Sequence, residues 1–268
     1  MSVLRKRASG IRRGASSSAF RILAPAAIIV AMMTTGIAVT LRNASPVLGA
    51  TDDCPIAGPP PQTLVFAVDT TNQLVADEPR TVELNLEAGI AKLPAGSRVA
   101  LVEIGAVAPT EPVILFSRCL PGNADNAARN RFRQEVMTPL KAHLATLSAR
   151  PEAPTSAIVE TVLALVDDEN LHRKGTALTI RLETDGLQNS AYANAYRAKP
   201  FPMAPAGTLR GVDIEIDALR NPKAVAEQPK AFDRLTEWLR GGTPSHLLFE
   251  RPAWLALAAG GKKHVSSR

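Results

Sequence analysis

The chain has only two cysteines, Cys54 and Cys119, among its 268 residues. Their spacing matches no zinc motif, because structural zinc sites need closely spaced cysteine and histidine ligands. The sequence also lacks a Gly-x-Ser-x-Gly elbow, a P-loop and a Gly-x-Gly-x-x-Gly run after a strand. None of its four histidines has a visible serine or cysteine partner motif. The sequence therefore lacks the common signatures of hydrolases, nucleotide-binding enzymes and zinc proteins.

Acidic residues are missing from the first 51 positions, since the first acid is Asp52. Six basic residues lie within positions 1–21: Arg5, Lys6, Arg7, Arg12, Arg13 and Arg21. Seven of the 31 basic residues lie at or before Arg42, which leaves 24 against 25 acidic residues in the rest of the chain. The net charge of +6 therefore reflects the N-terminal cluster, and it does not predict nucleic-acid binding.

Residues 22–41 contain no charged side chain. Twenty helical residues span about 30 Å, the thickness of a bilayer core, and a buried core helix is rarely this long and uncharged. The basic cluster before this segment predicts a cytoplasmic tail at 1–21, a transmembrane helix at 22–41 and a periplasmic or extracellular remainder. The alternative is a secretory signal peptide that is cleaved near Gly49.

Prolines and glycines crowd residues 42–62, which predicts a semi-rigid linker between the anchor and a folded domain. Both cysteines lie beyond the predicted anchor, where disulfides form and persist. Pairing of Cys54 with Cys119 and two free buried thiols both remain open at this point.

Strand and helix patterns alternate through the rest of the chain. Short apolar or alternating runs predict strands at 64–68, 99–107, 113–116, 178–182 and 212–216. Apolar residues at helical spacing predict helices at 77–93, 132–147 with a kink at Pro139, 157–166, 232–239 and 254–259. This order indicates an α/β fold with a mostly parallel sheet and one hairpin strand. The polar alternation of the last two strands favours positions toward the sheet edge.

Polar groups follow the predicted strands at one rim of this sheet. Asp69-Thr70-Thr71 ends the first strand, Thr155-Ser156 precedes an apolar helix, and Asp185-Gly186 ends a later strand. Ligands of open α/β sheets bind beyond the carboxyl ends of the strands, and oxygen ligands suit Mg²⁺. The residues therefore predict a site for a hard cation such as Mg²⁺ or Mn²⁺. The alternative is that both aspartates only cap turns.

Three segments together resemble a known family: 66–71 (Phe-Ala-Val-Asp-Thr-Thr), 156–158 (Ser-Ala-Ile) and 182–187 (Leu-Glu-Thr-Asp-Gly-Leu). In this order they look like a von Willebrand factor type A domain, over roughly residues 63–242. The resemblance implies a doubly wound fold and a metal-ion-dependent adhesion site. Carried over residue by residue, the implied ligands are Asp69, Thr71, Ser156 and Asp185. Gln73 departs from the pattern, because the family has a second serine there.

The resemblance also implies that the hairpin strand runs back toward the edge where the first strand begins. Cys119 ends that strand and Cys54 precedes the first one, so the resemblance implies a disulfide away from the rim.

These observations predict a membrane-anchored module that binds a protein partner, with or without an ion, and carries a C-terminal extension at 243–268. One alternative is a metal-free structural component of an envelope complex. Another is a hydrolase of phosphate esters that uses Asp69 as nucleophile. In haloacid-dehalogenase-like phosphatases a second aspartate stands two residues on, where this chain has Thr71. The sequence thus favours a non-enzymatic role.

Overall fold

The computed structural model describes residues 54–260, except 57, 73, 76, 122–125, 150 and 198–200. All described residues belong to one compact unit, 46–268. The predicted tail 1–21, transmembrane helix 22–41, most of linker 42–62 and the cut near Gly49 lie outside them. Within the described ranges, no helix is both long and apolar enough to cross a bilayer.

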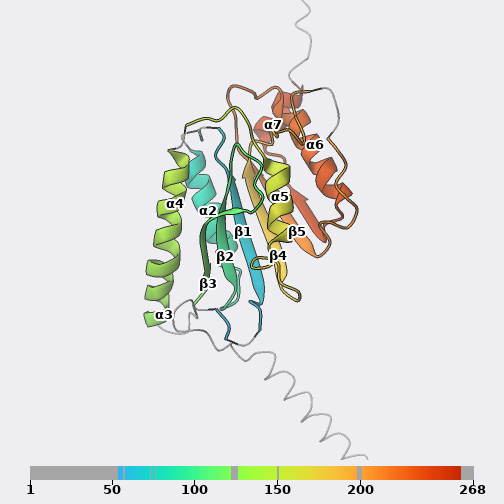
Figure 1. Cartoon of the computed structure of the whole chain (residues 1–268). Helices are drawn as coiled ribbons and strands as arrows, with labels where there is room; N and C mark the ends of the chain where they lie inside the picture. The colour runs from blue at the N-terminus through green and yellow to red at the C-terminus, as the bar shows by residue number, and fades with distance from the viewer. Residues whose placement is uncertain are drawn as a thin grey trace, which may run out of the picture. The chain divides into compact units, whose positions relative to one another are not determined.

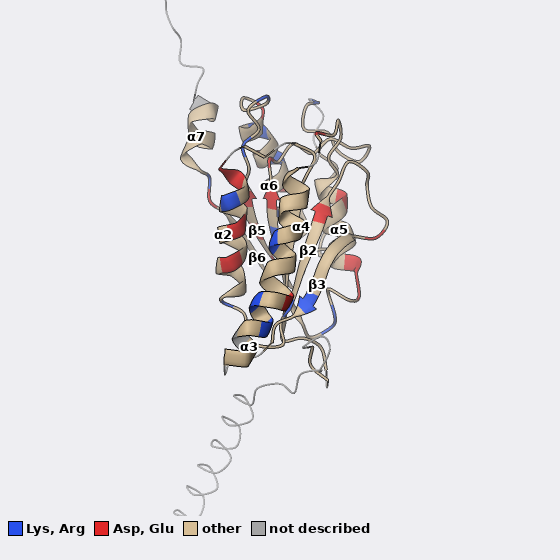
Figure 2. Cartoon of the chain, turned by 90° about the vertical axis from the view of Figure 1, so that its left-hand side faces the viewer, with Lys and Arg blue, Asp and Glu red and all other residues tan. Residues whose placement is uncertain are grey.

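A six-stranded sheet forms the centre of the domain (Figure 1). The strands are β1 (Gln62–Asp69), β2 (Arg98–Ile104), β3 (Val113–Cys119), β4 (Ala177–Thr184), β5 (Val212–Ala218) and β6 (His246–Phe249), in the spatial order β3-β2-β1-β4-β5-β6. All neighbours pair in parallel except β2 and β3, whose arrows run in opposite directions in Figure 2. The predicted α/β class, with a mostly parallel sheet and one antiparallel hairpin strand, is confirmed.

Helices cover both faces of the sheet (Figure 1). One core contains apolar residues of α2 (Glu78–Ile90), η1 (Phe132–Met137) and α4 (Thr138–Ser148). The other contains apolar residues of α5 (Ile158–Asp167), α6 (Gln228–Gly241) and α7 (Ala253–Gly260). A short helix, α3 (Asn126–Arg131), precedes η1. Both α7 and strand β6 fall within the predicted extension 243–268, and both pack on the domain.

Strand β1 shows why its apolar run is uniform. Leu64, Phe66 and Val68 enter the core under α2, whereas Val65 and Ala67 enter the core under α5. Successive strand residues point to opposite faces, so a strand covered on both sides must be apolar at every position.

Strands β4 and β5 were expected to lie toward the sheet edge. Strand β5 does lie next to the edge strand β6, but the prediction is wrong for β4, which lies between β1 and β5, so the polar residues of β4 have another cause. Arg181 on β4 makes ion pairs with Asp217 at 2.5 Å and with Glu183 and Glu215 at 3.5 Å. Asn85 of α2 donates to Glu183 at 3.2 Å. These contacts therefore let polar side chains lie on an interior strand.

Cys54 and Cys119 form a disulfide at the end of the sheet where β1 begins and β3 ends. The predicted pairing is confirmed, and neither of the two cysteines is free.

Candidate functional site

Asp69 and Asp185 lie at the carboxyl ends of two adjacent parallel strands. Asp69 is the last residue of β1 and Asp185 directly follows β4, and Val68 is in register with Glu183. After β1 the chain builds strands toward one edge of the sheet, and after β4 it builds strands toward the opposite edge. The two aspartates therefore lie at the topological switch point between β1 and β4. Open α/β sheets bind their ligands at such points.

Asp69 is held by a set of short hydrogen bonds. Its Oδ1 accepts from the backbone N–H and the hydroxyl of Thr71, at 3.1 and 2.6 Å. Its Oδ2 accepts from the hydroxyls of Ser156 at 3.2 Å and Thr184 at 2.8 Å. The structure thus brings the predicted residues Asp69, Thr71 and Ser156 together.

Asp185 has its own ring of donors and does not bond to the Asp69 group directly. Its Oδ1 accepts from the backbone N–H of Leu187 at 2.9 Å, and its Oδ2 accepts from the side-chain amides of Asn72 and Asn221. Asn72 thus connects the loop after β1 to the end of β4. The side-chain amide of Gln228, at the start of α6, donates to the Asp185 carbonyl at 3.0 Å.

Both carboxyl groups are buried, and each is only 3% exposed. Burial raises the pKa of Asp69, although the bonds from Thr71, Thr184 and Ser156 oppose the rise. Burial, followed by repulsion from Asp69, raises the pKa of Asp185 to about 7. Placing two carboxylates side by side out of water is costly, and a bound cation would offset this cost.

Glu78 adds a third acid to the same region. Its carboxylate accepts from the backbone N–H groups of Val75, at 2.7 Å, and Arg220. Burial raises the pKa of Glu78 as well. A cavity of about 10 Å³, large enough for roughly one water molecule, lies among Asp69, Asn72, Glu78 and Asp185, with three neighbouring residues completing its lining.

The donor set is consistent with a hard cation. Carboxylates, hydroxyls and amide oxygens are the ligands that Mg²⁺ and Ca²⁺ take, and Mg²⁺ keeps several waters. Among the described side chains, no group of three histidine, cysteine, aspartate or glutamate residues is arranged to hold an ion. Hydroxyl groups such as those of Thr71 and Ser156, together with water, would have to complete the shell. Gln73 lies outside the described residues.

The arrangement gives no support to nucleophilic attack by Asp69. Both of its oxygens accept protein hydrogen bonds and its side chain is buried, whereas a nucleophile must reach a substrate phosphorus.

Sequence reasoning missed Asn72, Glu78, Thr184 and Asn221. Thr184 stands directly before the predicted Asp185, and Asn221-Pro222 follows β5 at the same rim as a typical turn dipeptide. Thr184 and Asn221 could therefore have been identified from the sequence. Glu78 was visible only as an acid in the first turn of a helix.

No protein-family model matches the chain, and no curated protein matches it. Three solved structures with low similarity are an aerotolerance-related membrane protein from Bacteroides fragilis carrying multiple mutations to serines, the conserved hypothetical protein BatB from Bacteroides thetaiotaomicron, and the human COPII-coat protein Sec24c. The first has a TM-score of 0.39 and 9% identity, over 74% of this chain and 96% of that one. The second has a TM-score of 0.39 and 10% identity, over 74% and 95%. Sec24c has a TM-score of 0.41 and 13% identity, over 71% of this chain and 29% of its own. At this level the similarities carry no argument about function, which rests on the residues of this chain.

Proposed function

We propose that this chain is a membrane-anchored, extracytoplasmic module that binds a protein partner at the rim formed by Asp69 and Asp185. The observation that carries the proposal is the convergence of three distant segments on one pair of buried carboxylates. Thr71, Ser156 and Thr184 all donate to Asp69, while Asp185 lies beside it with a raised pKa. Maintaining such a costly arrangement at a switch point is typical of a binding site.

A divalent cation, Mg²⁺ or Mn²⁺, is part of the proposal. Asp69, Thr71, Ser156 and Asp185 would hold it, with water in the remaining positions. The ion would offset the repulsion between the two carboxylates and present a positive centre to an oxygen atom of the partner.

The membrane tether rests on the uncharged segment 22–41 behind its basic cluster. A reporter enzyme that is active only outside the cytoplasm, fused after Arg268, tests this topology. We expect activity, and a silent reporter would contradict the extracytoplasmic location.

Photo-crosslinking in intact cells tests the binding rim. Lys223 has 73% of its side chain exposed and lines a cavity of about 250 Å³ together with Asn72 and Asn221. A photoreactive amino acid at position 223 should capture a partner. The matched control is position 174, an exposed lysine in the turn before β4, at the opposite end of that strand.

Two comparisons decide the outcome. The proposal predicts a crosslinked product from position 223 that is absent from position 174 and is lost in Asp69→Ala. A product that persists unchanged in Asp69→Ala would instead support the metal-free structural role. Equal crosslinked products from both positions would contradict specific binding of a partner at this rim.

A further inference from the structure

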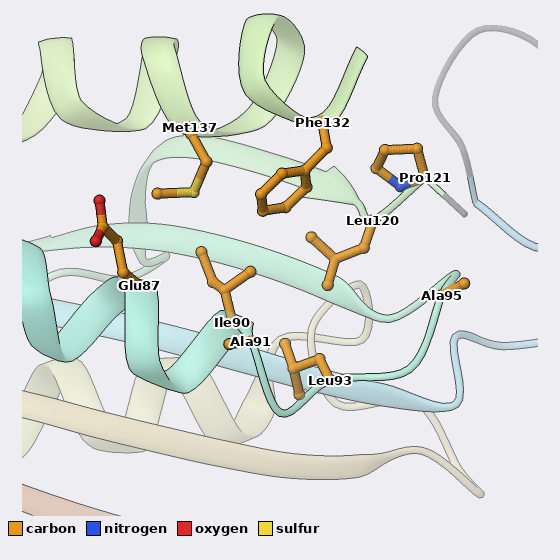
Figure 3. Close-up of a pocket in the computed structure, with 9 residues that line it drawn as sticks. All are labelled: Glu87, Ile90, Ala91, Leu93, Ala95, Leu120, Pro121, Phe132 and Met137. Carbon is orange, nitrogen blue, oxygen red and sulfur yellow. The ribbon is translucent and has the colours of Figure 1, made fainter. Parts of the chain in front are cut away.

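An apolar pocket lies far from the aspartate rim, between α2 and the helical segment η1–α4 (Figure 3). Its volume is about 480 Å³, within the range of ligand pockets in proteins. Phe132 and Met137 project from one wall toward Ile90 and Leu120 (Figure 3). Phe132 and Met137 are only partly buried against the core beneath them. The pocket is therefore a gap that the domain's own described side chains do not fill.

A π-helix shapes this pocket. Residues Phe132–Met137 form η1, and the N–H of Thr138 bonds to the carbonyl of Arg133, five residues back. In an α-helix, side chains five residues apart point about 140° away from each other. With i→i+5 bonding, five residues come close to one turn, so Phe132 and Met137 face the same side. Such π segments are rare and are often found at functional sites.

The pocket continues into a polar region. A second cavity of about 490 Å³ shares Glu87, Phe132 and Met137 with the first, and Arg133 and Lys141 also line it. Lys141 pairs with Glu83 at 2.5 Å and with Glu87 at 2.6 Å, so this one cation is shared by two carboxylates. Arg133 is exposed, and no described carboxylate forms an ion pair with it. The groove thus joins an apolar slot to an available cation.

The apolar end of the groove lies where the chain enters the domain. Leu120 and Pro121 line that end, and they directly follow Cys119, which is bonded to Cys54. In the sequence, Cys54 follows the segment 22–41, which the proposed function takes as the membrane anchor. A membrane origin of the ligand rests on the proposed function, whereas the pocket itself does not.

We propose that this groove binds a single acyl chain that carries an anionic head, as in a fatty acid or lysophospholipid of the membrane. The apolar chain occupies the slot between Ile90, Leu120, Phe132 and Met137, and the head pairs with Arg133. Charge complementarity favours this occupant, because a carboxylate or phosphate pairs well with a guanidinium. An acyl chain also suits an apolar pocket, one end of which is lined by Ala95 and Pro121 (Figure 3).

Photo-labelling of the full-length chain in phosphatidylcholine nanodiscs tests the proposal. The probe is a sixteen-carbon fatty acid with a terminal diazirine, and the comparison probe is its methyl ester. We expect labelled peptides to contain residues 90–93 or 132–137, and excess unlabelled palmitate to compete. Met137→Trp should fill the slot and reduce labelling roughly fivefold or more, equivalent to about 1 kcal/mol. Met203→Trp, at a site 85% exposed, is the matched control and should label normally.

Arg133→Gln tests the head group. It should weaken labelling by the acid about tenfold, the value of a charge-assisted hydrogen bond, and leave labelling by the ester unchanged. Arg210→Gln, at another exposed arginine, should change neither. Asp69→Ala should label like wild type, so failure of the cation site and failure of this pocket are distinguishable.

Three results would overturn the proposal. Labelling spread evenly along the chain, or not reduced by competing palmitate, would show nonspecific insertion. Unlabelled wild type would show that the groove does not bind an acyl chain. Covalent dimers that trap residues 132–137 would identify a second copy as the occupant.

Discussion

Thr184, the last residue of β4, donates its hydroxyl to Oδ2 of Asp69, the last residue of β1, over 2.8 Å. The two residues are 115 positions apart in the sequence. The same hydroxyl accepts the backbone N–H of Gly186 at 3.0 Å, which positions the turn that carries Asp185. One side chain therefore couples both carboxylates of the rim.

Thr184→Val keeps the shape of this side chain and removes both bonds. We expect the free energy of unfolding to fall by about 1–3 kcal/mol, because the Gly186 N–H loses its buried partner. Urea denaturation at pH 7 measures the change. A loss well below this range would show that water replaces the hydroxyl.

Asp185 should make stability depend on pH. Its folded pKa of about 7 exceeds its ordinary value of 3.8, so the folded state keeps a proton that the unfolded state releases. Its contribution to stability is complete below about pH 4 and is lost as pH rises toward 7. Asp185→Asn should therefore match wild type at pH 4 and be the more stable protein at pH 7, measured by urea denaturation in EDTA. Parallel curves for the two proteins would contradict the raised pKa.

Glu183 provides the matched comparison for Asp185. It is fully buried, and burial followed by repulsion from Asp217 raises its pKa from 4.5 to about 8. Glu183→Gln should gain stability relative to wild type as pH rises from about 4.5 to 8, by the same linkage. Because Glu183 contacts Arg181 and Asn85 and not the rim, we expect added Mg²⁺ to stabilise this variant and the wild type equally. Loss of that effect would place Glu183 in the site.

The disulfide should contribute substantially to stability. Cys54 and Cys119 are separated by 65 positions, and closing a loop of that size stabilises by about 4 kcal/mol in the chain-entropy model. The double variant Cys54→Ser, Cys119→Ser should lose about this amount in urea denaturation. Mass spectrometry after thiol blocking checks the bond itself, and two alkylated cysteines in the wild type would refute it.

Local patterns were enough to predict most of the fold. The uniform run at β1 and the alternation at β4 indicated strands, and two aspartates after parallel strands had to meet at one rim. Strand β6 was missed because four residues, His246–Phe249, give too short a pattern. The helix predicted through 132–147 contains the π segment η1, and Pro139 lies in the first turn of α4 directly after it. A change in hydrogen-bond register leaves no clear trace in apolar spacing.

The rest of the site could not be predicted because its contacts are long-range. Asn72 and Asn221 donate to one oxygen of Asp185 from the loops after β1 and β5. Glu78 reaches the backbone of Arg220, 142 positions away. Such pairings follow from the strand order, in which β1 lies next to β4, and not from any local motif.

Calorimetric titration of the purified chain with Mg²⁺ and Mn²⁺ tests whether Asp69 and Asp185 hold a cation. We expect saturable heat for the wild type at pH 8, where the Asp185 carboxyl is ionised. The heat should vanish in Asp69→Ala and in the closer mimic Asp69→Asn, and it should persist in Glu183→Gln. No heat in the wild type, or the same heat in both Asp69 variants, would contradict a cation site at this rim.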